Sequence, residues 1–95
     1  MKIVKIDRRF KLYDEGFHYL AAFGPTVEER ILFAKIRKSL REKYGVDRQY
    51  NRTGNVGYEI EYNPVWRYDL EKRNGIRSRI FVTDEAIITF ALLCV

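Results

Sequence analysis

Histidine and cysteine, the side chains most versatile in acid–base, nucleophilic and metal chemistry, are scarce in this 95-residue chain and lie far apart in the sequence. His18 is the only histidine and Cys94 is the only cysteine. A metal site needs several His, Cys or carboxylate ligands, and a histidine base needs a partner that orients it. The sequence has no glycine pattern typical of a phosphate loop or a dinucleotide fold. We therefore predict no catalytic residue, no metal and no cofactor, with His18 as a structural residue and Cys94 as a small core residue.

Three carboxylates are the best candidates for a cation site. Glu59 and Glu61 alternate along one predicted strand and therefore point to the same side, and Asp69 follows after the turn at Asn63-Pro64. Such a group could bind a cation, but alternating acids are also ordinary on a strand face that meets solvent. We expect the ordinary face.

Basic residues are more concentrated than acidic ones. The net charge is +5, and residues 25–55 alone hold eight Lys and Arg against four acidic residues, a net of +4. A field gathered in this way can steer a polyanion to one place, although a solvated outer helix face has the same composition. The predicted contacts with nucleic acid or another partner are Arg37, Lys38, Arg41, Arg48, Tyr50, Arg52, Arg77 and Arg79, with Tyr50 stacking on a base.

Aromatic residues exceed what a core of this size requires: seven Tyr, six Phe and one Trp. Tyr58, Tyr62, Trp66 and Tyr68 are predicted to form an aromatic interface patch, because aromatic side chains are enriched at binding hot spots. The run Gly57–Tyr62 also resembles the Gly-aromatic strand that stacks bases in RNA-recognition sheets. Unlike that strand, it carries Glu59 and Glu61, which would repel phosphate.

These residues have to be positioned by one helix and several strands. Residues 25–44 are predicted to be helical, since Thr26 and Glu29 fit a capping box, in which the glutamate reaches back to the cap. The helix places its apolar residues on one stripe and is followed by Gly45 as a left-handed terminator. The stripe is Leu32, Phe33, Ile36, Leu40 and Tyr44.

The remaining segments read mostly as strands. Apolar and polar residues alternate in 4–12, 56–62 and 66–71, which predicts strands with one buried face. Asp14 to Gly16 suggest a hairpin loop into a strand at 17–23, and residues 45–55 are interpreted as a polar loop. Asn74-Gly75 predicts a tight hairpin in which Tyr68 faces Phe81 and Asp69 faces Ile80. The apolar segment 86–95 is predicted to be a central strand.

The predicted fold is therefore a single α+β domain over residues 1–95. One helix packs on an antiparallel sheet in the order ββαββββ, with a C-terminal β-meander. An edge strand such as the first could pair with a second copy and form a homodimer.

The C-terminal third has a resemblance of its own. Residues 66–95, with the run Arg79-Ile80-Phe81-Val82, an acidic turn and an apolar segment, look like the closing hairpins of the RelE/HigB-type ribosome-dependent mRNA interferases. The resemblance implies mRNA cleavage, with Arg77 or Arg79 contacting phosphate. Such toxins carry basic catalytic residues after this last apolar segment, which in the present sequence ends at Val95.

Three functional hypotheses follow. The leading one is a non-enzymatic protein that binds RNA or single-stranded nucleic acid. The alternative is an inhibitor or adaptor of the kind that phages and mobile elements use, docking against an acidic surface of a host protein such as a nuclease or defence complex. The third is a diverged interferase. The N-terminus lacks the apolar run of a signal peptide, and the last ten residues are too short for a membrane span, so we expect a cytoplasmic protein without membrane contact.

Overall fold

The computed structural model describes residues 1–54, 57–71 and 77–95. It is an α+β fold, as predicted, with a helix packed on an antiparallel sheet. The elements in chain order are β1 (Lys2–Lys5), the 3-10 helix η1 (Lys11–Glu15), β2 (Tyr19–Phe23), α1 (Val27–Tyr44), β3 (Arg48–Thr53), β4 (Gly57–Tyr62), β5 (Trp66–Glu71), β6 (Arg77–Val82) and α2 (Glu85–Leu93).

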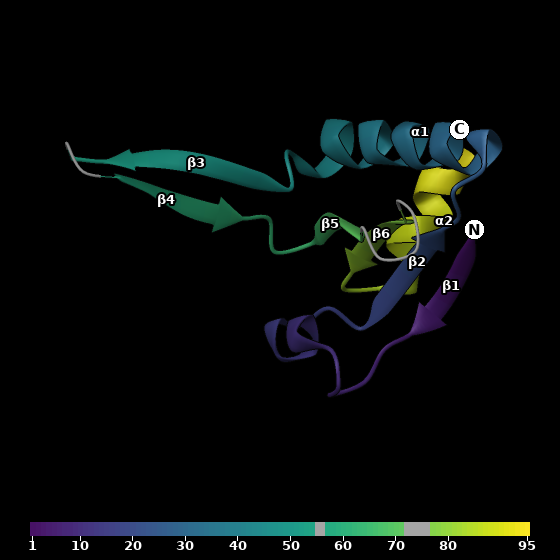
Figure 1. Ribbon diagram of the computed structural model, residues 1–95, viewed down its shortest axis with the longest axis horizontal. Helices are drawn as coiled ribbons and strands as arrows, with labels where there is room; N and C mark the ends of the chain where they lie inside the picture. The colour runs from purple at the N-terminus through teal and green to yellow at the C-terminus, as the bar shows by residue number, and fades with distance from the viewer. Residues whose placement is uncertain (55–56, 72–76) are drawn as a thin grey trace.

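The strands form two separate antiparallel sheets. Within residues 1–54, 57–71 and 77–95, four strands pair in the order β1-β2-β6-β5, and β3 pairs only with β4. Figure 1 shows the β3–β4 hairpin projecting from the body of the molecule like an arm. The predicted C-terminal meander is therefore interrupted, because β4 leaves the sheet that β5 and β6 share.

Helix α1 begins and ends close to the predicted residues. The Thr26 hydroxyl accepts a hydrogen bond from the Glu29 N–H, as a helix cap should. The Glu29 carboxylate, however, accepts from the Gly24 N–H and the Met1 ammonium group, so the predicted reciprocal bond to Thr26 is replaced. Gly45 ends the helix with φ of 89°, a conformation that suits glycine.

The apolar stripe of α1 packs on one face of the four-stranded sheet, as predicted. Phe33, Ile36 and Leu40 are buried there against Trp66 and residues of β2, β6 and α2. On the opposite sheet face, a smaller cluster of Ile6, Phe17, Leu20 and Phe81 is covered by residues of η1 and its approach. Both faces of the sheet are therefore covered near its centre.

The C-terminal segment is a helix and not the predicted central strand. The Asp84 carboxylate accepts from the Ala86 N–H at 2.9 Å and caps α2, whose Ile87, Ile88 and Ala91 are buried against α1 and the sheet. A segment that is apolar on all sides has no periodicity to separate a buried strand from a buried helix. Cys94 ends this helix in an exposed position, which corrects its prediction as a core residue.

The first strand is shorter than predicted. β1 ends at Lys5, and the chain then turns where Asp7 accepts hydrogen bonds from the backbone and side chain of Arg9. The expected hairpin loop is instead the end of η1, and Gly16, with φ of 97°, closes it. His18 is exposed, and its ring lies 4.8 Å from the ring of Tyr13.

Two further predictions along the chain are wrong. Residues 48–53, interpreted as part of a polar loop, form β3. In the β5–β6 pair Tyr68 lies opposite Ile80 and Asp69 opposite Arg79, one residue away from the predicted register. Burial decides this register, because Tyr68 and Ile80 both face α1, whereas Phe81 faces η1. The predicted Asn74-Gly75 turn lies outside the described residues.

Candidate functional site

The β3–β4 arm has two chemically different faces. Residues directly opposite in an antiparallel pair lie on the same face, and the register pairs Arg48 with Tyr62, Tyr50 with Ile60 and Arg52 with Tyr58. We call this surface the arm face; its residues are Arg48, Tyr50, Arg52, Tyr58, Ile60 and Tyr62. The reverse face carries Gln49, Asn51, Thr53, Glu59 and Glu61.

The arm face is open to solvent. Tyr50 is 61% exposed and Tyr58 is 72% exposed, and Ile60 and Tyr62 are also exposed. Within the described residues Arg52 has no hydrogen-bond or ion-pair partner. A two-stranded hairpin gains little stability by itself, and contiguous exposed aromatic surface is typical of a binding site. The arm face is therefore available to a partner.

The base of the arm is fastened to the body by side chains that bond to backbone groups. Asn63 donates to the carbonyl oxygens of Tyr44 at 2.8 Å and Val46 at 3.1 Å, and accepts from the Val65 N–H at 2.8 Å. The indole N–H of Trp66 donates to the Gly45 carbonyl at 3.0 Å. These bonds join the end of α1, both arm strands and β5 at one point.

Arg48 is the innermost residue of the arm face, and it is held on three sides. Its guanidinium donates to the Asp47 carboxylate at 3.0 Å and to the Tyr68 carbonyl at 2.7 Å. Its Cζ lies 5.6 Å from the ring centroid of Tyr62 and 5.3 Å from that of Tyr68. Burial works against its charge, but the hydrogen bond and charge of Asp47 outweigh burial and raise the pKa of Arg48.

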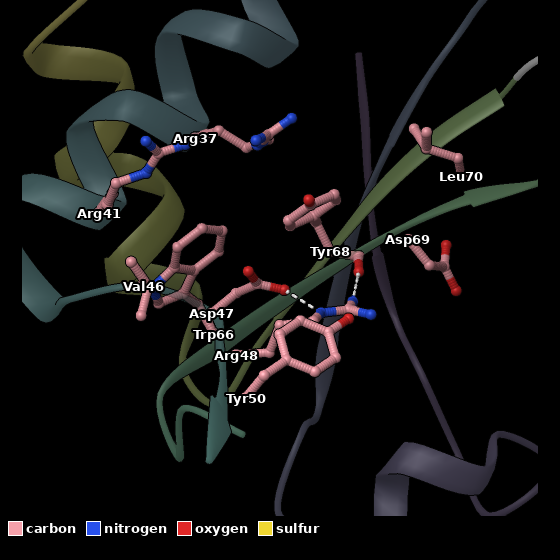
Figure 2. Close-up of a pocket in the computed structure, with 10 residues that line it drawn as sticks. All are labelled: Arg37, Arg41, Val46, Asp47, Arg48, Tyr50, Trp66, Tyr68, Asp69 and Leu70. Atoms are coloured by element: carbon pink, nitrogen blue, oxygen red, sulfur yellow. Dashed lines mark hydrogen bonds and ion pairs between the residues drawn. The ribbon is translucent and has the colours of Figure 1, made fainter. Parts of the chain in front are cut away.

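A cleft of about 450 Å³ opens between α1, the base of the arm and the outer edge of β5. Figure 2 shows Arg37 and Arg41 on its helix side and Tyr68 on its strand side. The Arg37 guanidinium lies 4.1 Å from the ring centroid of Tyr68, at cation–π distance. We call this the α1 cleft; it is lined by Arg37, Arg41, Val46, Asp47, Arg48, Tyr50, Trp66, Tyr68, Asp69 and Leu70.

A second cleft of about 300 Å³ lies on the η1 side of β5 and shares Arg48, Tyr68 and Asp69 with the first. Arg79 donates to both Asp69 oxygens at 2.8 Å, and Arg67 lies 3.9 Å over the Tyr62 ring while pairing with Glu15 at 3.3 Å. The arginines of this cleft are thus bound to carboxylates. It also contains Phe10, Lys11, Leu12 and Phe81.

The structure brings most of the predicted binding residues together. Six of them line the α1 cleft: Arg37, Arg41, Arg48, Tyr50, Trp66 and Tyr68. Three more, Arg52, Tyr58 and Tyr62, extend the same surface along the arm. Trp66 is only 1% exposed, so it is mainly a core residue and not the predicted surface aromatic. Lys38 is exposed on α1 but does not line the cleft.

Two predicted arginines lie elsewhere. Arg79 is on the η1 side of the sheet, bound to Asp69. Arg77 begins β6 opposite Glu71, at the end of the strand away from the base of the arm, where Trp66 pairs with Val82. The sequence does not place either residue relative to α1, because their positions depend on which sheet face each strand turns to the helix.

Asn63 and Arg67 are functional candidates that the sequence interpretation missed. The sequence pattern indicates only a turn at Asn63, yet this residue anchors the arm through the bonds described above. Arg67 alternates with Trp66 and Tyr68 along β5, and this alternation was the available signal that it lies on the opposite sheet face.

The three carboxylates considered as a candidate cation site are not brought together. Glu59 and Glu61 share the reverse face of the arm, where Asn51 donates to Glu61 at 3.2 Å, while Asp69 is bound to Arg79. Among the residues that the structure describes, no cluster of three or more His, Cys, Asp or Glu side chains could hold a metal ion. In the same residues no helix is long and apolar enough to cross a membrane.

Comparisons with known proteins found no relative from which the role of this site could be transferred. No family model, no curated protein and no solved structure matches the chain. What the arm face and the α1 cleft bind must therefore be inferred from their own geometry and chemistry.

Proposed function

We propose that this protein is a non-enzymatic binding protein for single-stranded nucleic acid, with RNA as the foremost candidate. The observation that carries the proposal is the composition of the arm face. On β3 this face presents Arg48, Tyr50 and Arg52, and on β4 the residues opposite them are Tyr62, Ile60 and Tyr58, respectively. Single-strand binders combine cations that follow the backbone with aromatic rings on which bases stack.

The exposure of the rings favours unpaired bases. Tyr50 and Tyr58 are diagonal neighbours on the arm face, and both are more than half exposed. Bases within a duplex are stacked on each other, so their faces are closed to tyrosine rings, whereas a single strand presents them. Each base stacked on an aromatic side chain contributes about 1–3 kcal/mol, with little sequence preference.

The distribution of charge over the two faces of the arm is also compatible with a bound phosphate backbone. Glu59 and Glu61, which would repel phosphate, point to the reverse face, while Arg52 is on the arm face. A strand of this length spans about 20 Å, since each residue rises about 3.4 Å. The arm face therefore offers room for a few nucleotides, with the arginines of the α1 cleft beyond its base.

The test removes the rings and the outer charge without touching the base of the arm. Substituting Tyr50→Ala, Tyr58→Ala and Arg52→Gln together should weaken binding to a fluorescent 12-mer oligouridylate at least about a hundredfold. The measurement is anisotropy at several salt concentrations. Arg48 is left intact, because its bonds to Asp47 and Tyr68 belong to the fold.

The matched control is Gln49→Ala on the reverse face, which should bind as tightly as the wild type. Wild-type affinity should fall steeply with added salt, and an equimolar duplex should compete poorly. Binding that does not respond to salt, or no binding to any single strand, would refute the proposal.

A second candidate is an inhibitor or adaptor that docks on an acidic surface of another protein. The observation that favours it is Ile60, an exposed aliphatic side chain between Tyr58 and Tyr62 that adds little to base stacking but suits a protein interface. Ile60→Ser should leave oligonucleotide affinity within about twofold, whereas a protein interface centred there should lose at least about tenfold. This variant separates the two candidates.

Messenger RNA cleavage receives less support. The Arg79 guanidinium, which an interferase-like site would need for phosphate, donates to both oxygens of Asp69. A homodimer through the β1 edge remains part of the proposal, since in the described part of the chain β1 pairs with β2 alone. A cytoplasmic setting also remains part of it, since Cys94 is an exposed free thiol suited to a reducing compartment.

A further inference from the structure

The α1 cleft carries two arginines that have no acidic partner among the residues that the structure describes. Arg37 and Arg41 are one helical turn apart and both line the cleft. The carboxylates of the cleft are already engaged, Asp47 by Arg48 and Asp69 by Arg79. Within the described residues neither Arg37 nor Arg41 has an acidic partner, so the paired charges cancel and two positive charges remain.

Arg37 is also fixed in place before any ligand arrives. The Cζ atom of its guanidinium lies 4.1 Å from the ring centroid of Tyr68 and 5.6 Å from that of Phe33. Its Nε–H is buried and, among the described residues, has no hydrogen-bond partner. A buried donor without an acceptor is costly, and a water or an ion that accepts from it is one recognised explanation.

Tyr50 connects this cleft to the arm face, because it belongs to both surfaces. A base stacked on Tyr50 therefore brings its attached phosphate toward the mouth of the cleft. The indole of Trp66 and residues that join α1 to β3 also line the cleft. A strand that follows the arm face from its tip to its base arrives at the cleft with one end.

From these observations we propose that the α1 cleft binds the terminal phosphate of a single strand, that is, a phosphomonoester. The inference rests on the proposed function and names the end of the strand as the preferred site. A phosphomonoester carries about −1.5 to −2 charges near pH 7, which matches Arg37 and Arg41, whereas an internal phosphodiester carries only one. Planar guanidinium groups bind such an anion through paired hydrogen bonds.

The experiment compares four forms of one 8-mer oligouridylate: unphosphorylated, 5′-phosphorylated, 3′-phosphorylated and phosphorylated at both ends. We expect one singly phosphorylated form to bind about 10–100-fold more tightly than the unphosphorylated form, as one or two charge-assisted hydrogen bonds imply. Arg41→Gln and Arg37→Gln should each remove most of this preference. Arg30→Gln, an exposed site on the same helix outside the cleft, should preserve it.

Folding is controlled separately, since Arg37 packs on Tyr68. Arg37→Lys keeps the charge but not the planar fork, so it should recover only part of the preference, while exposed Arg41 reports the site with little risk to the fold. Equal affinity for all four oligonucleotides would overturn the terminal-phosphate inference and leave the proposed function intact.

If no oligonucleotide binds, the proposed function fails, and the cleft is then tested alone. Titration with uridine 5′-monophosphate and uridine 3′-monophosphate, with uridine as control, should shift the NMR signals of Tyr68 and the Arg37 guanidinium. A shift with either monophosphate but not with uridine supports a phosphomonoester site. No shift with either refutes it.

Discussion

The body, which contains the four-stranded sheet and the helices, and the β3–β4 arm both consist of antiparallel strands, but they differ in burial. In the body, the strands of the four-stranded sheet bury Trp66, Ile80 and Val82 almost completely under the helices. In the arm, all six residues of β4 are exposed, and its aromatic face has no covering element in the described structure. Alternation along a strand therefore indicates two different faces, but only the tertiary contacts decide whether the aromatic face is buried in the core or exposed at the surface.

The two regions also hold their shape by different means. The body is stabilised by apolar burial on both sheet faces. The arm has the hydrogen bonds of its own ladder and the cluster of bonds at its base, centred on Asn63 and Trp66. We call this cluster of bonds the joint. If the two regions are stabilised separately, substitutions in the body should lower stability and substitutions at the joint should affect both regions. Substitutions on the arm face should weaken binding alone.

The largest effect is expected from Trp66→Ala. This change removes a fully buried ring and the bond to the Gly45 carbonyl, and should lower the free energy of unfolding by about 3–5 kcal/mol. Tyr58→Ala on the arm face should change it by less than about 0.5 kcal/mol. Denaturant titration of both variants measures the contrast, and similar losses would mean that the arm is part of the core.

An intermediate effect is expected at the joint. Asn63→Ala leaves the Tyr44 and Val46 carbonyls without their side-chain donor, and should cost about 1–3 kcal/mol. Relative to the wild type, amide hydrogen exchange in this variant should accelerate more in β3 and β4 than in β5 and β6. Asn51→Ala, which removes a bond between exposed side chains of the arm, is the control and should change neither measurement appreciably. Uniform acceleration over the whole molecule would contradict a separable arm.

The smallest effect is expected far from the arm, at Glu29. Hydrogen bonds from the Met1 ammonium group and the Gly24 N–H lower the pKa of this carboxyl. Because its pKa is lower in the folded protein, the ionised form stabilises the fold above the ordinary glutamate pKa of about 4.3, and this contribution is lost as pH falls through the folded pKa. Glu29→Gln should therefore lose less stability than the wild type between pH 6 and pH 3, measured as melting temperature.

Glu28→Gln is the matched control, since it removes the neighbouring carboxylate of the first turn of α1 without touching the contacts of Glu29. Identical acid sensitivity in all three proteins would show that the contacts of Glu29 do not hold the N-terminus to the body.

Much of the body could be predicted because its signals are local. The helix at residues 27–44 has a cap, an apolar stripe and a glycine at its end, and each was readable without knowledge of the rest of the fold. The helix at 85–93 was not, since it is apolar on every side and its strand or helix state depends on what surrounds it. The β5–β6 register failed for a similar reason: the turn signal was local, but the covering helix decided it.

The candidate site was predicted in its residues but not in its arrangement. Arg48, Tyr50 and Arg52 could be named from composition, yet their shared face follows from β3, a polar strand that was interpreted as a loop. The separation of Glu59 and Glu61 from these arginines also needs the pairing register. The pairing of Asp47 with Arg48 and of Asp69 with Arg79 is tertiary, so the surplus charge of the α1 cleft could not be counted in advance.

The chain's single tryptophan is placed at the joint between the two regions. Its ring packs 6.2 Å from that of Tyr68, its N–H bonds to the backbone just after α1, and it borders the α1 cleft. Any shift of the arm against the body, or any ligand in the cleft, changes the surroundings of that one indole. The indole is therefore an intrinsic fluorophore with which ligand binding in the cleft and movement of the arm can be tested without an attached label.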